Sequence, residues 1–349
     1  MTTEFPFPRD IFLYSLVAIV CSLTLTPFSI YLARRFGLID RPGKFPHKIH
    51  STPTPLAGGT ALIFCLILLS LLFFNRWEDR FPKALVLASV IVYLFGLWDD
   101  IRGLSAIPKL VGQVLAGAVL IASDASVHFI GSLHLPSLSP AFVNVLDIGL
   151  TLFWLIGVTN AMNMIDSMDG IAIGLSGIAF LFFILVASLS GQVYLTEISV
   201  ILLGITAGIY YYNVTPARLF LGDSGSQTFG FIVAAIAMEY APVGFSPLSS
   251  WFVPILLVGL PIFDTVLVVY SRIRRNIPFY RANLDHTYHR LVDFGLEERR
   301  AVLTIHLTAI LLNLIAFITF YLPPLGANMI FGTILIGGMF LVYFLDRRK

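Results

Sequence analysis

Long apolar segments determine what this 349-residue chain can fold into. A helix needs about 20 mostly apolar residues to cross the hydrocarbon core of a bilayer, and segments near that length follow one another along the sequence. Hydrophobic residues make up 57% of the chain and charged residues 12%, which excludes an ordinary soluble domain. We therefore predict an all-α, polytopic integral membrane protein with about eleven transmembrane helices. The predicted helices cover approximately residues 11–33, 56–74, 83–98, 107–123, 141–162, 171–190, 194–212, 226–240, 250–271, 302–322 and 326–345.

The distribution of Lys and Arg predicts the orientation of these helices. The segments on one side of the predicted membrane hold five, two, one, seven and three basic residues, which is 18 of the 22 in the chain. Because loops rich in Lys and Arg stay in the cytoplasm, we expect the N-terminus outside and the C-terminus in the cytoplasm. The cytoplasmic segments are then residues 34–55, 99–110, 213–225, 272–301 and 346–349.

Three further features have ordinary explanations. The first apolar segment shows no signal-peptide pattern, because only Arg9 precedes it, beside Asp10, and no small-residue cleavage site follows. Cys21 and Cys65 both lie inside apolar segments and are expected to be small buried residues, not a disulfide or a metal pair. The net charge of +2 gives no reason to expect nucleic acid as a partner.

The few acidic residues gather where apolar segments end, on the predicted cytoplasmic side. Four polar motifs fall there: Asp99-Asp100, the run from Asn160 to Gly170, the Gly222-Asp223-Ser224-Gly225 segment and the His286–Arg290 segment. Asp264 lies in the ninth apolar segment. Carboxylates are costly at a membrane and usually mark function. One membrane face thus collects carboxylates, amides, histidines and arginines, as a site for an anionic cytosolic substrate would require. Residues 1–349 are predicted to form one transmembrane catalytic domain, with active-site loops near 34–55, 99–110, 160–170, 213–225 and 272–301.

Each motif has a chemical interpretation and a simpler alternative. The Asp99-Asp100 pair can hold a metal or orient a reacting group, although an isolated pair is more often a solvated helix end. Asn160, Asn163 and Asp166 are three residues apart and fan across one helix face, and the helix is expected to break at residues 167–170. The Gly222–Gly225 segment could bring backbone close to a phosphate while Asp223 supplies a hard oxygen ligand, or it could be only a turn.

These motifs, in this order, resemble the polyprenyl-phosphate N-acetylhexosamine-1-phosphate transferases. The resemblance also includes a first-loop motif, Gly37-Leu-Ile-Asp40-Arg-Pro42, which continues through His47-Lys48-Ile-His50 to Gly58-Gly59, and it spans about residues 30–300. It implies eleven helices, a cytoplasmic site in the plasma (inner) membrane, Mg²⁺ with Mn²⁺ as an alternative, and transfer of a sugar-1-phosphate from a UDP-sugar to undecaprenyl phosphate or a similar lipid, with release of UMP. A homodimer is a further possibility that the sequence leaves open.

The resemblance also implies a role for each matching residue. Asp99 and Asp100 would be the catalytic carboxylates, Asp223 and Asn163 the metal ligands, and Asp169 a neighbour of the uracil. The other residues that the resemblance assigns to substrate binding are Asn160, Asp166, Gly170, Lys48, His50, Lys109, His286, His289 and Arg290. Two positions depart from the family pattern: Tyr288 stands where a histidine is usual, and Leu56-Ala57 stands where an arginine is common.

The mechanism and the substrate stay partly open. A lipid phosphate is largely dianionic near neutral pH, so a direct displacement needs mainly relief from charge repulsion, while a covalent aspartyl-phosphate intermediate is an alternative. UDP-N-acetylglucosamine is the first candidate donor, with another UDP-N-acetylhexosamine or a UDP-muramoyl-pentapeptide as alternatives. From a different class, a cation-coupled secondary transporter could also place carboxylates in a membrane, but the sequence shows no matching motif in its other half.

Overall fold

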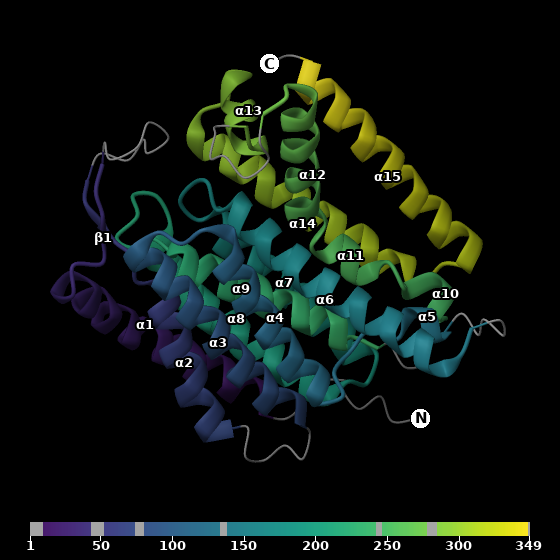
Figure 1. Cartoon of the computed structure of the whole chain (residues 1–349), viewed down its shortest axis with the longest axis horizontal. Coiled ribbons are helices and arrows are strands. Elements are labelled where there is room, and N and C mark those ends of the chain that lie inside the picture. Colours follow the sequence, from purple (N-terminus) through teal and green to yellow (C-terminus); the bar gives the residue numbers. More distant parts are fainter. Residues whose placement is uncertain are drawn as a thin grey trace.

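Most of the chain that the structure describes is helical. A computed structural model describes residues 10–42, 52–73, 80–132, 138–241, 246–277 and 285–347, and Figure 1 shows their arrangement as one helical bundle. The longer helices are α1 (Ile11–Arg35), α2 (Gly58–Phe73), α3 (Arg80–Arg102), α4 (Ala106–Ala122), α6 (Pro140–Ile165), α7 (Ile171–Leu189), α8 (Val193–Asn213), α9 (Gly222–Glu239), α12 (Gly259–Arg274), α14 (Glu298–Thr319) and α15 (Pro324–Arg347). The shorter ones are α5 (Phe129–Ser132), α10 (Pro247–Ser250), α11 (Val253–Leu257) and α13 (Thr287–Asp293).

The helices confirm a polytopic membrane protein. Among the described residues, seven helices are long and apolar enough to cross a bilayer, namely α1, α3, α6, α7, α8, α14 and α15, and the bent pair α10–α11 and α12 gives an eighth. The apolar helices α2 and α4 are shorter, with 16 and 17 residues. Every predicted segment contains helix, while the count of eleven spans and their orientation remain predictions.

Helix α9 is the centre of the bundle. It packs against α2, α3, α6 and α7, and its residues from Ser224 to Ala237 are all buried. Glycines permit the close approach: a Cβ at Gly96 of α3 would lie 2.6 Å from the Cα of Ser224, and one at Gly230 of α9 would lie 3.0 Å from the Cα of Thr159 of α6. Small residues at such contacts are typical of membrane helices, whose association depends on packing.

A small β-ribbon departs from the all-helical prediction. Strands β1 (Ile39–Asp40) and β2 (Thr54–Pro55) pair antiparallel in the first predicted cytoplasmic loop. Leu56 then forms a bridge with Phe220, just before α9. The ribbon therefore ties this loop to the beginning of the central helix.

The ninth predicted segment, 250–271, was expected to be one continuous helix, and this expectation is wrong. The axis bends by 68° between Leu248–Leu257 and Gly259–Arg274. Pro261 explains the break, because proline has no N–H to donate and its ring clashes with the carbonyl four residues earlier, that of Leu257. The Asn313 amide of α14, oriented so that its nitrogen donates, reaches the carbonyl oxygen of Leu256 beside the break at 3.2 Å.

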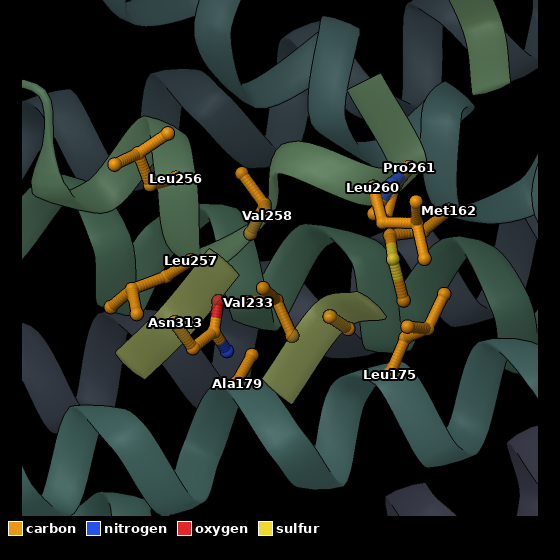
Figure 2. Close-up of a pocket in the computed structure, with 11 residues that line it drawn as sticks. Met162, Leu175, Ala179, Val233, Leu256, Leu257, Val258, Leu260, Pro261 and Asn313 are labelled. Carbon is orange, nitrogen blue, oxygen red and sulfur yellow. The ribbon is translucent and has the colours of Figure 1, made fainter. Parts of the chain in front are cut away.

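A small cavity lies beside this break (Figure 2). It measures about 10 Å³ and is lined by apolar side chains of α6, α7, α9, α11, α12 and α14, with Asn313 as the one polar member. A space of that size holds about one water molecule. It is therefore too small for a lipid tail or a sugar.

Candidate functional site

Four helix ends meet at one end of the bundle and carry most of the predicted site. Asp99 comes from the last turn of α3, Lys109 from the first turn of α4, Asn163 from the last turn of α6 and Asp223 from the first turn of α9. We call these four residues the charged layer. The sequence predicted that their segments share one face, and the structure brings their side chains into hydrogen-bonding contact.

Lys109 joins the two carboxylates of the charged layer. Its Nζ donates to Asp99 Oδ2 at 2.8 Å and to Asp223 Oδ2 at 3.1 Å. The other Asp99 oxygen accepts the backbone N–H of Leu104. The lysine side chain is 25% exposed and that of Asp223 is 33% exposed, whereas that of Asp99 is 7% exposed. Lys109 and Asp223 can thus meet a ligand from solvent, while Asp99 lies behind them.

Asp100 does not point into the charged layer as its neighbour does. Its two oxygens accept the backbone N–H groups of Asp223 at 2.8 Å and of Ser224 at 3.1 Å. Asp100 therefore caps the N-terminus of α9 from another helix, where a carboxylate also interacts favourably with the helix dipole. Gly222, with φ +70°, makes room, since a Cβ there would lie 2.7 Å from Asp100 Oδ2.

This arrangement corrects one sequence-based interpretation. The Gly222–Gly225 segment was considered as a backbone cradle for a phosphate. It forms the first turn of α9, and Asp100 already occupies the N–H groups of Asp223 and Ser224. A phosphate cannot use these two donors unless Asp100 moves away.

Two more carboxylates flank the charged layer. The helix α6 ends at Ile165, just before the break predicted at residues 167–170, and Asp166 is its C-terminal cap residue. Burial and the negative charges of Asp223, Asp169 and Asp100 raise the pKa of Asp166 to about 8. Asp169 accepts the N–H of Ala217 at 3.3 Å. Asp166 is therefore mostly protonated near neutral pH, and the other carboxylates of the region still carry more negative charge than Lys109 can balance.

Gly170 has the left-handed conformation that the predicted break requires. Its φ is +80° and it caps the N-terminus of α7, and its N–H donates to the Asn213 side chain at 3.1 Å. Gly170 thus shapes the loop that presents Asp169, and its own N–H is already occupied.

A layer of amides, which the sequence did not single out, lies one helical turn from the charged layer. Asn160 Nδ2 donates to Gln113 Oε1 at 2.8 Å, and Gln113 Nε2 donates to Gln227 Oε1 at 3.1 Å. Gln113 and Gln227 are four residues after Lys109 and Asp223, a helical spacing that could have identified them. Asn160 was predicted to bind substrate, but the structure places it in this layer, beside and not within the charged layer.

The histidine segment is held by an aspartate of α12. Asp264, which is fully buried, contacts His286 Nδ1 at 2.8 Å through one oxygen and accepts the N–H of Thr287 at 2.6 Å through the other. This leaves Nε2 of His286 as the ring atom available to a substrate. The rings of His286 and His289 are 6.3 Å apart, so both predicted histidines lie together.

Arg290 has a different place from the one predicted for it. It is 2% exposed, and its guanidinium donates to Asp285 O at 3.0 Å, Leu345 O at 2.6 Å and Ser271 Oγ at 2.8 Å. It therefore fastens α13 to α12 and α15, and we leave it out of the substrate site. Lys48 and His50, which were also predicted to bind substrate, lie outside the described residues.

The donor set fits a magnesium ion that shares its ligands with a substrate. In the described part of the chain, no three His, Cys, Asp or Glu side chains are placed to hold a metal among themselves. Mg²⁺, however, usually takes one or two protein carboxylates together with waters and substrate phosphates. Asp223 is the more exposed of the two carboxylates in the charged layer, and Asn163 directs its nitrogen to Asp223 Oδ1 at 3.0 Å. Rotation of the Asn163 amide by half a turn would direct its oxygen, in place of its nitrogen, toward an ion held by Asp223. The surplus negative charge of the surrounding carboxylates also favours binding of a cation.

Comparison with known proteins identifies the family. The sequence profile of glycosyl transferase family 4 matches residues 83–241, which include the whole charged layer. A protein of Bacillus subtilis (strain 168), named probable undecaprenyl-phosphate N-acetylglucosaminyl 1-phosphate transferase, is 30% identical over 306 residues, 87% of this chain and 83% of that protein. The chain belongs to glycosyl transferase family 4. This confirms the resemblance drawn from its motifs and removes the transporter alternative.

Two other relatives indicate how this family 4 transferase relates to the branches of the family. The decaprenyl-phosphate N-acetylglucosaminephosphotransferase of Mycobacterium leprae (strain TN) is 31% identical over 373 aligned positions, 98% of this chain and 92% of that protein. The phospho-N-acetylmuramoyl-pentapeptide-transferase of Staphylococcus carnosus (strain TM300) is 28% identical over 243 residues, 65% of this chain and 76% of that protein. The similarity to the N-acetylglucosamine relatives thus extends over more of the chain.

Proposed function

We propose that this transferase moves N-acetylglucosamine-1-phosphate from UDP-N-acetylglucosamine to a polyprenyl phosphate, such as undecaprenyl phosphate, and releases UMP. The observation that carries the proposal is the charged layer of Asp99, Lys109, Asn163 and Asp223. The relatives that align with most of this chain are named for the transfer of N-acetylglucosamine phosphate to a polyprenyl phosphate. Such a product would begin the synthesis of a cell-envelope glycan.

The chain's own residues can do most of what the reaction needs. The acceptor phosphate must approach a diphosphate of like charge, so bound cations have the largest effect on the barrier. Lys109 is the cation of the charged layer, and it can exchange its contact with Asp223 for a phosphate oxygen. Asp99, held by Leu104 and Lys109, would orient the acceptor or take a residual proton. His286, held in place by Asp264, would donate a hydrogen bond from Nε2 to the UDP-sugar.

Mg²⁺ is the proposed cofactor, with Mn²⁺ as an alternative. Asp223 would hold the ion, with Asn163 after its amide turns, and the bound ion would neutralise charge on the phosphoryl group being transferred. A direct displacement remains our preferred mechanism, because the dianionic acceptor needs no covalent help. Asp169, whose carboxylate lies in the loop before α7, is proposed as a contact of the uracil.

The donor is tested by competition. Purified protein in detergent with Mg²⁺ and undecaprenyl phosphate would receive UDP-N-acetylglucosamine, UDP-N-acetylgalactosamine and UDP-N-acetylmuramoyl-pentapeptide together, and the lipid products would be separated by mass. We expect the N-acetylglucosamine product to form at least about 10-fold faster than either competitor, since a polar pocket rejects a misfitting sugar strongly. A predominant muramoyl product would contradict the choice of donor.

The eleven-span topology and the cytoplasmic location of the site are also proposed. Ser105, beside the charged layer, would face the cytoplasm of the cell membrane, and Ser132 would face outside; both are exposed. In intact cells, a cysteine at Ser132 should react with an impermeant thiol reagent and a cysteine at Ser105 should not. Cys21 and Cys65 are buried and should give little background. Labelling of both introduced cysteines from outside would contradict the orientation.

A homodimer stays a prediction from the resemblance.

A further inference from the structure

Tyr288 is a buried residue whose hydroxyl has no hydrogen-bond partner among the described residues. It lies in α13 between His286 and His289, and the residue is 2% exposed. Its ring packs edge-on against His289, with ring centres 5.1 Å apart. A buried hydroxyl without a partner destabilises a protein, because its bond to water has been lost and nothing replaces it. Such a group in a native fold calls for an explanation.

The surroundings of Tyr288 connect it to the donor end of the site. Burial, together with the negative charges of Glu298 and Asp169, raises the pKa of the Tyr288 phenol to about 12, so both carboxylates lie near enough to act on this residue. Asp169 belongs to the loop before α7, in which Ser167 also has a buried hydroxyl with no partner in the described chain. The segment with His286 and His289 and the loop with Asp169 therefore lie close together, and both carry unused donors.

We propose that the Tyr288 hydroxyl donates a hydrogen bond to a neutral oxygen of the UDP-sugar, a hydroxyl or an amide carbonyl of its sugar or nucleoside. This inference rests on the proposed function. It names Tyr288 as a residue that determines donor specificity, at a position where the resembling family usually has histidine.

The electrostatics favour a neutral oxygen over a phosphate. Asp169 and Glu298 make the surroundings of Tyr288 negative, and a phosphate placed there would be repelled. The phenol stays protonated throughout the physiological pH range, so it is always a donor. A site built to satisfy a polar ligand group rejects analogues that lack the group, because the buried donor is then left unpaired.

Tyr288→Phe tests the proposal, because it removes one oxygen and keeps the ring that packs against His289. The dissociation constants of UDP-N-acetylglucosamine, UDP and UMP would be measured by calorimetry with the full-length protein in detergent. We expect UDP-N-acetylglucosamine to bind about 10-fold more weakly to the variant. If UDP and UMP bind as before, the contact is on the sugar, and if they weaken equally, it is on the nucleoside.

Tyr240→Phe is the matched control. Tyr240 follows the opposite end of α9, and its hydroxyl is hydrogen-bonded to Ser190 at 3.3 Å. This variant should leave all three dissociation constants unchanged and lower the melting temperature. Without ligand, Tyr288→Phe should keep or raise the melting temperature, since it removes an unpaired buried group.

Two results separate failure of this inference from failure of the proposed function. If Tyr288→Phe binds UDP-N-acetylglucosamine with wild-type affinity, the role of Tyr288 is overturned, whatever the melting temperature of the variant. Water or another residue would then already form a hydrogen bond with the hydroxyl. Absence of binding by the wild-type protein for all three uridine compounds would instead overturn the proposed function.

Discussion

Asp223→Asn is expected to lower kcat at least about 100-fold and to raise the Mg²⁺ concentration required for half-maximal rate. Asparagine keeps the shape of the side chain, so the contact with Asn163 can persist, but it removes the charge that pairs with Lys109 at 3.1 Å. Rates would be measured against Mg²⁺ concentration with both substrates saturating.

Asp99→Asn is the comparison that separates the two carboxylates of the charged layer. Asp99 is 7% exposed beside Lys109 and lies behind Asp223, so its variant should lose rate with little change in Mg²⁺ dependence. Equal shifts in Mg²⁺ dependence for both variants would mean that the two carboxylates share the ion, and the assignment of the metal to Asp223 would have to be abandoned.

Asp100→Asn is expected to lower both activity and stability, because Asp100 holds the beginning of α9. An asparagine has one oxygen for the two N–H groups that Asp100 accepts, those of Asp223 and Ser224, and its NH₂ group would face the second N–H. The loss of a charge-assisted hydrogen bond at a helix N-terminus costs about 1.5–3 kcal/mol. Activity should fall about 100-fold as Asp223 is displaced.

The stability effect should distinguish Asp100 from Asp99. Asp99→Asn keeps an oxygen for the N–H of Leu104 and should reduce the melting temperature less than Asp100→Asn does. If Asp100→Asn left the melting temperature unchanged while activity collapsed, Asp100 would act on the substrate directly, and the capping role derived from its contacts would not explain its importance.

Local features of the sequence predicted much of the site. The break after α6 followed from Ser167-Met-Asp-Gly170 in an otherwise apolar helix, and the structure ends α6 at Ile165. The four residues of the charged layer were also expected on one side. Successive transmembrane helices cross the membrane in opposite directions, and this places the segments that carry Asp99, Lys109, Asn163 and Asp223 on the same membrane face. Gly259 and Pro261 also signalled the bend before α12, although the ninth segment was predicted as a single helix.

Long-range contacts explain what the sequence could not predict. Asp99 and Asp100 are adjacent in α3, and only the packing of α9 against α3 decides that one meets Lys109 while the other caps α9. Arg290 resembled a phosphate ligand until the positions of Asp285 and the end of α15 were known. The pairing of Gln113 with Asn160 and Gln227 likewise depends on three helices meeting at one depth.

The nucleotide released during turnover tests the proposed reaction most directly. Purified protein would be incubated with UDP-N-acetylglucosamine labelled in the uridine, undecaprenyl phosphate and Mg²⁺, and the labelled nucleotide and the lipid product would be counted together, with Asp223→Asn as the inactive control. Transfer of the sugar with its phosphate predicts one UMP for each lipid-linked sugar diphosphate. Release of UDP with a lipid product that has gained the sugar but no second phosphate, or no reaction at all, would contradict it.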